Sequence, residues 1–220
     1  MQLAKGDIMK TIAVVMQKGG AAKSTLSRHG SIILPNSALL DLDPQGTTNA
    51  WIEGRIEAGI NKPMHLIADL GSADKVADKA RASGGVEWLI IDTPPEHDDQ
   101  RAIRKAIEMA DYVVVPTQPS IDDLRELPKT IPLIVEAGKP FAIVITRAKA
   151  GSRSLRDTQT ATAKLADHFG GVVCPHFMGN RVAYTDAVMS NQTVTEYEPK
   201  GQAAAEVAMI WNWVMEQVNV

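Results

Sequence analysis

The residues of this chain most suited to chemistry stand between Gln17 and Thr25, in the stretch QKGGAAKST. Glycines in such a loop let several backbone N–H groups converge on an anion, and a helix that begins there adds its own unpaired N–H groups. At this spacing Lys23 can place a charge on the β- and γ-phosphates of a nucleotide, and Ser24 can offer a hydroxyl to Mg²⁺. The stretch predicts a phosphate-binding loop, with a plain Gly-Gly turn beside an exposed lysine as the alternative.

The loop departs from the general pattern GxxxxGK[ST] at two positions. Gln17 and Ala22 stand where that pattern has glycine. If the backbone at Ala22 needs a positive φ, alanine adds about 1 kcal/mol or more of strain and places a methyl group beside the phosphates. This departure predicts a reduced activity.

Two acidic segments follow apolar runs that are typical of buried strands. The first, Asp41-Leu-Asp-Pro-Gln-Gly46, follows an Ala-Leu-Leu run, and Asp92 ends the run Trp-Leu-Ile-Ile. Asp92 can bind Mg²⁺ directly or through water, while Asp43 or Asp41 can orient an attacking water. Ligands of open parallel sheets bind at the carboxyl ends of the strands, so we expect these aspartates beside the phosphate loop. A helix cap or turn is the ordinary alternative for a single aspartate in such a place.

Composition limits the class of protein. The chain has 220 residues, 45% of them hydrophobic and 22% charged, which suits one soluble globular domain. A formal net charge of −3 gives no overall attraction to nucleic acid, so any DNA contact needs a local basic patch. One cysteine excludes an internal disulfide, and no apolar run approaches the roughly 18 residues of a membrane span. We expect a cytoplasmic protein with a short leader at residues 1–8 and one domain at 9–220.

Strand and helix signals alternate along nearly the whole domain, which predicts a doubly wound, mostly parallel sheet with helices on both faces. The expected strands are 11–16, 38–42, 88–92, 112–115, 141–146 and 172–174. The expected helices are 72–82, 99–110, 121–137, 152–168, 181–190 and 201–218, the second of them capped by Asp98 or Asp99. Gly30 and Pro35 are expected to end the helix after the phosphate loop early, and residues 51–63 are expected to be irregular.

Five motifs in this order give the chain a specific resemblance. They are QKGGAAKST at 17–25, DLDPQG at 41–46, IIDTPP at 90–95, VPTQPS at 115–120 and TVTEYEPK at 193–200. From about Lys10 to Val218 the chain resembles the ParA family of plasmid and chromosome partition ATPases. More broadly, it is similar to the deviant Walker A group that includes MinD and the nitrogenase iron protein. Its length is similar to that of the small ParA type.

The resemblance implies a single-domain P-loop NTPase of the α/β class with ATP and Mg²⁺ as cofactors. It implies that Lys18 reaches across a homodimer to the partner's phosphates, that Lys23 is the loop lysine, and that Asp43 helps to position the hydrolytic water. These three are the candidate catalytic residues. The candidates for nucleotide contact are Gly19, Gly20, Ala21, Ala22, Lys23, Ser24, Thr25, Pro116, Arg147 and Met178, and those for Mg²⁺ are Ser24, Asp43 and Asp92.

A basic segment supplies the local patch that DNA binding would need. Between Arg147 and Lys164 five cations face one acid, Asp157. Hydroxyl residues intervene, a composition that suits phosphate contacts rather than the reading of bases. The candidate DNA-binding residues are Lys149, Arg153, Arg156 and Lys164, and an ordinary solvated helix face is the alternative.

The sequence therefore predicts an ATP-dependent dimer that binds double-stranded DNA nonspecifically. By resemblance, a centromere-binding partition protein stimulates hydrolysis, the protein associates with the nucleoid, and no membrane is involved. Three alternatives stay open: a positioning ATPase for another cargo, a nucleotide-binding scaffold with weak or lost hydrolysis, and a small-molecule ligase or kinase on the same fold. Ala22 and the short first helix favour the scaffold, whereas Lys18 disfavours the ligase.

Overall fold

A computed structural model describes residues 9–95 and 100–219 of the chain. The strands are β1 (Lys10–Val14), β2 (Ser37–Asp41), β3 (Met64–Leu66), β4 (Trp88–Asp92), β5 (Tyr112–Thr117), β6 (Phe141–Ala148) and β7 (Val172–Gly179). The helices are α1 (Lys23–Ile33), α2 (Thr47–Glu57), α3 (Ala73–Ala82), α4 (Gln100–Met109), α5 (Ile121–Glu136), α6 (Arg153–Phe169), α7 (Ala183–Met189), α8 (Val194–Tyr197) and α9 (Gln202–Val218). The expected leader and the expected caps Asp98 and Asp99 lie outside the described residues.

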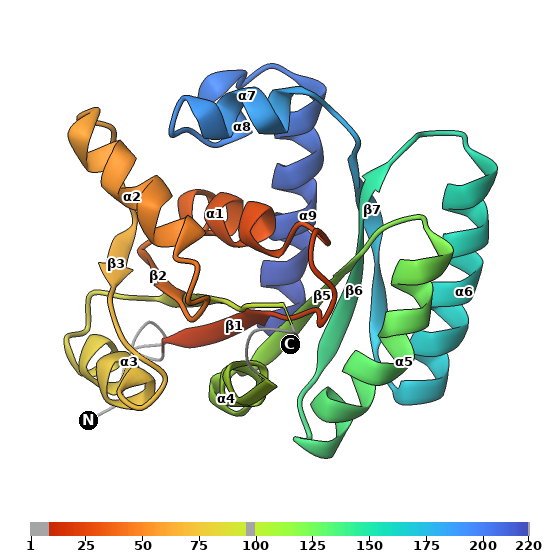
Figure 1. Cartoon of the computed structure of the whole chain (residues 1–220), viewed down its shortest axis with the longest axis horizontal. Coiled ribbons are helices and arrows are strands. Elements are labelled where there is room, and N and C mark those ends of the chain that lie inside the picture. Colours follow the sequence, from red (N-terminus) through yellow and green to blue (C-terminus); the bar gives the residue numbers. More distant parts are fainter. Residues whose placement is uncertain (1–8, 96–99, 220) are drawn as a thin grey trace.

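The strands form one sheet in the order β3-β2-β4-β1-β5-β6-β7, and every neighbouring pair is parallel. Alternate residues along the central strand β1 enter opposite cores: Ile12 and Val14 pack on one face, and Ala13, with Val15 just after the strand, packs on the other. Helices α1, α2, α7 and α9 cover the first face, and α3, α4, α5 and α6 cover the second (Figure 1). The predicted doubly wound arrangement is confirmed.

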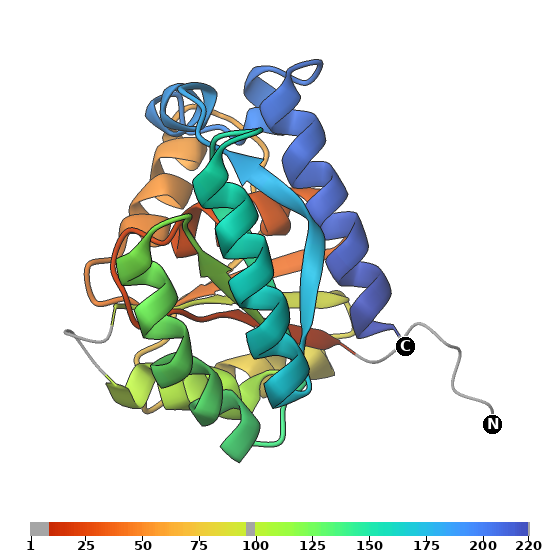
Figure 2. The same cartoon turned by 90° about the vertical axis from the view of Figure 1, so that its right-hand side faces the viewer.

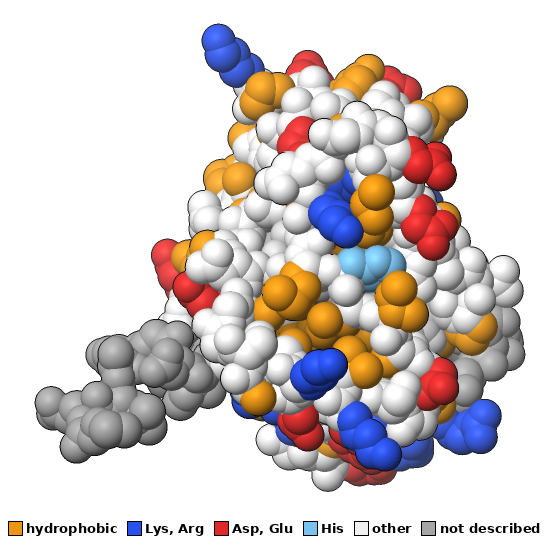
Figure 3. Space-filling model, turned by 90° about the vertical axis from the view of Figure 1, so that its left-hand side faces the viewer, with side chains coloured by type: hydrophobic (Ala, Val, Ile, Leu, Met, Phe, Trp, Pro, Cys, Tyr) orange, Lys and Arg blue, Asp and Glu red, His pale blue; other side chains and the backbone are white. Residues whose placement is uncertain are grey.

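The sheet ends in β3 on one side and β7 on the other. Strand β3 has three residues and was not predicted, because its half-buried sequence shows no apolar alternation. On the face that carries this edge, hydrophobic side chains gather on the surface (Figure 3). The exposed apolar residues of this part of the chain are Ile56, Met64 and Ile67.

The expectation that Gly30 ends the first helix is wrong. Helix α1 runs through Gly30 to Ile33 and ends just before Pro35. A Cβ atom at Gly30 would collide with the indole ring of Trp211, which is fully buried on α9. Glycine stands in this helix because two helices approach closely there, a reason that the local sequence does not contain.

The expectation that residues 51–63 are irregular is also wrong for their first part, because α2 extends to Glu57. Both backbone N–H groups of Thr48 and Asn49 donate to Asp41 Oδ2, at 3.1 Å each, and this carboxylate caps the helix from outside it. The buried face of α2 holds Trp51 beside the fully buried Arg55. A charged residue on the buried face hides the helical period of the sequence.

Helix α1 is tied to the short helix α8 by a buried histidine. His29 Nδ1–H donates to the carbonyl of Thr25 at 2.6 Å, and His29 Nε2 accepts the backbone N–H of Val194 at 3.0 Å. Burial lowers the pKa of His29 to about 4. The neutral ring therefore joins the helix that follows the phosphate loop to the segment at 193–200.

We expect this ring to make stability depend on pH. The folded-state pKa of His29 lies below its ordinary value of 6.5, so the stabilisation is complete above pH 6.5 and is lost as the pH falls through about 4. Between pH 7 and pH 4.5 the free energy of unfolding of the wild type should fall by about 2 kcal/mol relative to that of His29→Gln. Urea denaturation of both proteins across this range measures the difference.

Asp41 changes stability with pH in the opposite direction to His29, and comparison with His29→Gln removes the contribution of Asp41. Burial first, and then the neighbouring Asp92, raise the pKa of Asp41 to about 6, so its contribution favours folding at low pH and is lost as the pH rises through about 6. Both proteins carry Asp41, and its effect cancels in the difference. A stability difference that stays constant with pH would contradict the prediction for His29.

Candidate functional site

The predicted phosphate loop connects β1 to α1 and turns through two left-handed residues, Gly20 with φ 79° and Ala22 with φ 71°. Neighbouring strands hold the loop, because Thr146 Oγ1 donates to the carbonyl of Ala21 at 3.2 Å. The Gln118 amide donates to the carbonyl of Gly20 at 2.9 Å. Lys23, the first residue of α1, folds back so that its Nζ donates to the carbonyl of Lys18 at 3.2 Å. The turn therefore places the lysine over the loop and the helix N-terminus behind it.

A cleft of about 280 Å³ opens over this loop. Asp43 reaches it from the loop after β2, and Arg147 reaches it from β6. Of the loop residues predicted to contact the nucleotide, Ala21 is buried and does not line this cleft. The lining residues are Gly19, Gly20, Ala22, Lys23, Ser24, Thr25, Asp43, Thr93, Pro95 and Arg147.

A second cleft of about 410 Å³ shares Thr25 and Arg147 with the first. Met178, predicted to lie beside the base, lines it, whereas Pro116 is buried within β5 and lines neither cleft. The other lining residues are Arg28, Gly179, Asn180, Arg181, Tyr184, Thr185, Val188 and Met189. Adjoining clefts of this size can hold the phosphates and the base of one nucleotide.

Asp92 is the last residue of β4, is fully buried and does not line the phosphate cleft itself. Its carboxylate accepts a hydrogen bond from Thr48 Oγ1 at 2.7 Å and one from Ser27 Oγ at 3.2 Å. Burial raises the pKa of Asp92, while the hydroxyls of Thr48 and Ser24 act against the rise. Asp92 therefore meets the cleft through Ser24. Sequence reasoning missed Ser27 and Thr48, whose types are common at helix starts and carry no distinct signal.

This donor set fits ATP with Mg²⁺. The loop offers a lysine and a helix N-terminus to the phosphates, and a hydroxyl and carboxylates to a hard cation. Within residues 9–95 and 100–219 no cluster of three His, Cys, Asp or Glu side chains could hold a metal ion alone, so oxygen ligands from a nucleotide and water would complete the coordination.

Lys18 forms an ion pair within the chain. Its Nζ lies 2.6 Å from Asp123 Oδ2, and the side chain of Asp123 is only 2% exposed at the first turn of α5. Ser120 Oγ also donates to this carboxylate at 2.5 Å. Sequence reasoning did not single out Asp123, because an aspartate in the first turn of a helix is ordinarily read as complementing the helix dipole.

Arg147 has a strained backbone at the mouth of both clefts. Its φ is 49°, a value that is rare for a long side chain, and it lies where the pairing of β6 with β7 shifts register. The side chain is exposed and makes no hydrogen bond or ion pair with the residues that the structure describes. Strain at a ligand edge is typical of functional positions.

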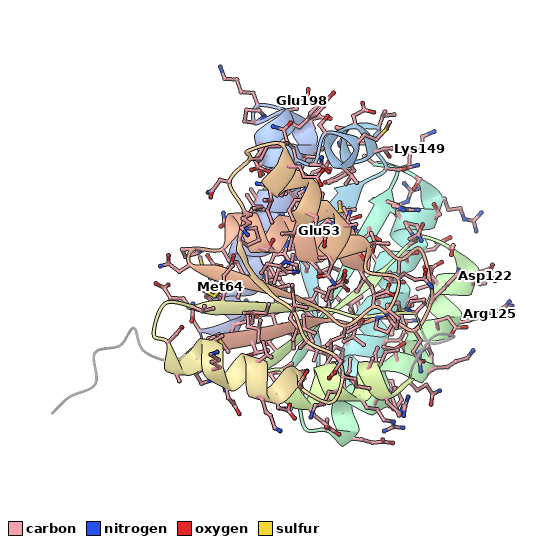
Figure 4. The ribbon with its side chains drawn as sticks, turned by 60° about the vertical axis from the view of Figure 1, so that its left-hand side comes forward. Glu53, Met64, Asp122, Arg125, Lys149 and Glu198 are labelled. Carbon is pink, nitrogen blue, oxygen red and sulfur yellow. The ribbon has the colours of Figure 1, made fainter. Side chains whose placement is uncertain are left out.

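Helix α6 runs beside β7 at the edge of the sheet (Figure 2), and the basic residues of this region are exposed. Lys149 extends outward from the loop after β6 (Figure 4). Arg153 is paired with Asp157 at 3.5 Å, and Arg156 donates to the carbonyl of Gly151 at 2.8 Å. Lys164 is exposed two turns farther along α6. All four candidates are therefore exposed, and the helical spacing of Arg153, Arg156 and Lys164 places these three on one face of α6.

Comparison with solved structures finds the same fold in several nucleotide-binding proteins. MinD of Aquifex aeolicus superposes with a TM-score of 0.76 at 16% identity, covering 94% of this chain and 98% of that one. A Borrelia burgdorferi protein described as a plasmid partition protein and bound to AMPPNP gives 0.68 at 18%, covering 96% and 99%. Cobyrinic acid a,c-diamide synthase of Mycobacterium smegmatis, with an ATP analogue and magnesium, gives 0.71 at 18%, covering 96% and 95%.

The chain therefore has the α/β fold of a P-loop NTPase like MinD, which confirms the predicted fold class. No protein-family model matches the chain, and no curated protein matches it. The proteins with this fold are thus described as a cell-division protein, a plasmid partition protein and a synthase. At these identities the likeness establishes the fold and not the activity. Within the described ranges, no helix is long and apolar enough to cross a membrane.

The left-handed backbone at Ala22 leads to a test. Ala22→Gly should raise the free energy of unfolding by about 1 kcal/mol, because glycine adopts φ 71° without a steric cost. It also removes a methyl group from the lining of the phosphate cleft, so nucleotide affinity should not fall. Ala21→Gly is the matched control: Ala21 is buried beside it with no positive φ and should lose stability. If Ala22→Gly and Ala21→Gly lowered the free energy of unfolding equally, strain at Ala22 would be contradicted.

Proposed function

We propose that this chain is an ATPase of the ParA type that acts in DNA partition. The observation that carries the proposal is the phosphate cleft, where Lys23, Ser24 and Asp43 meet from two separate segments of the chain. A cation for the phosphates, a hydroxyl for Mg²⁺ and a carboxylate for the attacking water are the groups that phosphoryl transfer to water requires. When bound, Mg²⁺ would offset the charge that develops on the phosphoryl oxygens.

The residues of the candidate site have separate roles in the proposed reaction. Lys23 and the N–H groups of Gly19 to Thr25 bind the phosphates. Ser24, which is hydrogen-bonded to the buried Asp92, would bind Mg²⁺. Asp43 orients the water, and Lys18 leaves Asp123 to reach the nucleotide of a second copy. Hydrolysis then depends on dimerisation, because neither copy alone presents both lysines to one set of phosphates.

DNA binding is proposed for the face made by Lys149, Arg153, Arg156 and Lys164. All four cations are exposed, and among the residues that the structure describes only Asp157 forms an ion pair with one of them, Arg153. Contacts to phosphates without reading of bases fit a nonspecific, salt-dependent interaction with double-stranded DNA. A centromere-binding partner that stimulates hydrolysis, and association with the nucleoid, complete the proposal.

One experiment tests both halves. Turnover of ATP with Mg²⁺, and binding of nonspecific duplex DNA in the presence of ATP, are measured for the wild type and for Arg153→Ala/Arg156→Ala/Lys164→Ala. Turnover by the wild type tests the ATPase half of the proposal, and DNA binding tests the other half. We expect DNA binding to weaken by about tenfold or more in the triple variant and to become less dependent on salt. The matched control Lys75→Ala/Lys79→Ala/Arg81→Ala removes three exposed cations from α3 and should bind like the wild type. Equal binding by both variants would remove the α6 face from the proposal.

A nucleotide-binding scaffold without hydrolysis is the second candidate, and the strained Ala22 favours it. Binding of AMPPNP together with no detectable turnover, and restored turnover in Ala22→Gly, would support the scaffold. No binding of nucleotide at millimolar concentration would overturn both candidates.

A further inference from the structure

Arg28 is a buried arginine in the second turn of α1, just beyond the phosphate loop. Its guanidinium NH2 donates to the carbonyl of Thr47 at 2.8 Å, and its Cζ lies 5.8 Å from the ring centroid of Trp51. Both of these contacts are with α2. A buried guanidinium loses its hydration, so it is retained where such contacts and nearby opposite charges compensate.

The opposite charges come from two neighbouring strand ends. Asp41 and Asp92 are partners in the register of β2 and β4, both are buried, and both favour the charged form of Arg28. Two carboxylates at adjacent strand ends repel each other. The guanidinium thus offsets this repulsion from the α1 side while it holds the carbonyl of Thr47.

The side chains of Arg28, Asp41 and Asp92 all make hydrogen bonds to the first turn of α2. Asp41 accepts the N–H groups of Thr48 and Asn49, Asp92 accepts Thr48 Oγ1, and Arg28 holds Thr47. Directly before this turn stands the Asp43–Gly46 loop, whose Asp43 lines the phosphate cleft. Asp43 is tied back to the same cluster, since its N–H donates to Asp41 Oδ1 at 3.0 Å. A shift of the first turn of α2 would therefore carry Asp43 with it.

We propose that Arg28 is a positioning residue for Asp43, which it acts on through the first turn of α2. Arg28 is 8% exposed and lines only the neighbouring cleft, whereas its contact with Thr47 leads to the segment that carries Asp43. This inference rests on the proposed hydrolysis of ATP. The inference connects α1, the helix after the phosphate loop, to the carboxylate of Asp43 in the phosphate cleft.

The test compares Arg28→Met and Arg28→Lys with the wild type in three measurements. Turnover at saturating ATP should fall by about tenfold or more in Arg28→Met, while the dissociation constant for AMPPNP stays within about threefold. Arg28→Lys keeps the charge and should recover part of the turnover. In nucleotide-free protein, hydrogen exchange at the amides of 48–50 should speed up by about tenfold in Arg28→Met, and exchange in β4 should not change.

Arg81→Met is the control, because it removes a half-exposed arginine that pairs only with Asp78 on α3 among the described residues. Unchanged turnover in Arg28→Met overturns the inference, as does a loss of AMPPNP affinity in proportion to turnover, which would make Arg28 a binding residue. Slower turnover with unchanged exchange at 48–50 also overturns it. A wild type that binds AMPPNP and does not hydrolyse ATP removes the proposed reaction and this role with it. Faster exchange at 48–50 would then leave Arg28 as a structural contact only.

Discussion

Lys18→Ala is expected to lower the turnover of ATP by about 10²–10³-fold while AMPPNP still binds, because the proposed role of Lys18 is to neutralise charge in the transition state. Lys23, which lines the cleft itself, remains in place to bind the ground state. Single-turnover measurements separate hydrolysis from binding. A loss of affinity as large as the loss of turnover would assign Lys18 to ordinary substrate binding instead.

The ion pair of Lys18 with Asp123 requires a second variant. Removal of Lys18 leaves a carboxylate that is 2% exposed without its cation, so Lys18→Ala also loses stability. Lys18→Gln keeps a hydrogen-bond donor for Asp123 and removes only the charge. Both variants should lose turnover alike although they differ in melting temperature. Recovered turnover in Lys18→Gln would show that the charge of Lys18 is not needed.

Substitution of Asp123, the partner of Lys18 in the ion pair, tests the same proposed role of Lys18. The ion pair must break before Lys18 can reach a second copy, so the pair favours the monomer without nucleotide. Asp123→Asn should therefore shift the dependence of turnover on protein concentration to lower concentrations. Turnover that is independent of protein concentration in the wild type would contradict a role for Lys18 in trans.

Glu196→Gln is expected to lower the free energy of unfolding by about 3 kcal/mol, because it leaves the Arg55 guanidinium buried without a counter-charge. The Arg55 side chain is 0% exposed, and its two terminal nitrogens lie 2.6 and 2.9 Å from the two oxygens of Glu196. The carbonyls of Asn191 and Asn61 accept further hydrogen bonds from Arg55, and its Cζ lies 4.7 Å from the ring centroid of Trp51. Glutamine keeps the shape of the side chain, so the change isolates the charge.

Urea denaturation measures the effect, with Glu198→Gln as the control. Glu198 stands two residues farther along and is exposed (Figure 4), and its substitution should change stability by less than about 0.5 kcal/mol. The double variant Arg55→Met/Glu196→Leu should regain most of the loss, because it removes both charges and fills the space with apolar atoms. A double variant as unstable as Glu196→Gln would show that packing, and not the unpaired charge, is responsible.

The sequence by itself determined the class of fold and predicted which residues gather at the candidate site. The glycines, Lys23 and Ser24 follow one strand, Asp43 follows a second, and Asp92 ends a third. In a parallel sheet the carboxyl ends of strands lie at one edge, so local order along the chain places such residues near one another before any contact is known. The strained φ of Ala22 was also predictable, since the pattern asks for glycine at that position.

Only the tertiary structure decided which distant side chains complete and hold the site. Lys18 meets Asp123 across 105 residues, Arg55 meets Glu196 across 141, and Gly30 faces Trp211 of another helix. An aspartate in the first turn of a helix, an arginine in a segment without apolar periodicity and a glycine near a proline each have a commoner local explanation. Nothing else in the sequence favours the long-range contact over that explanation. The partner of a buried charge depends on how the layers pack, and local periodicity does not record that packing.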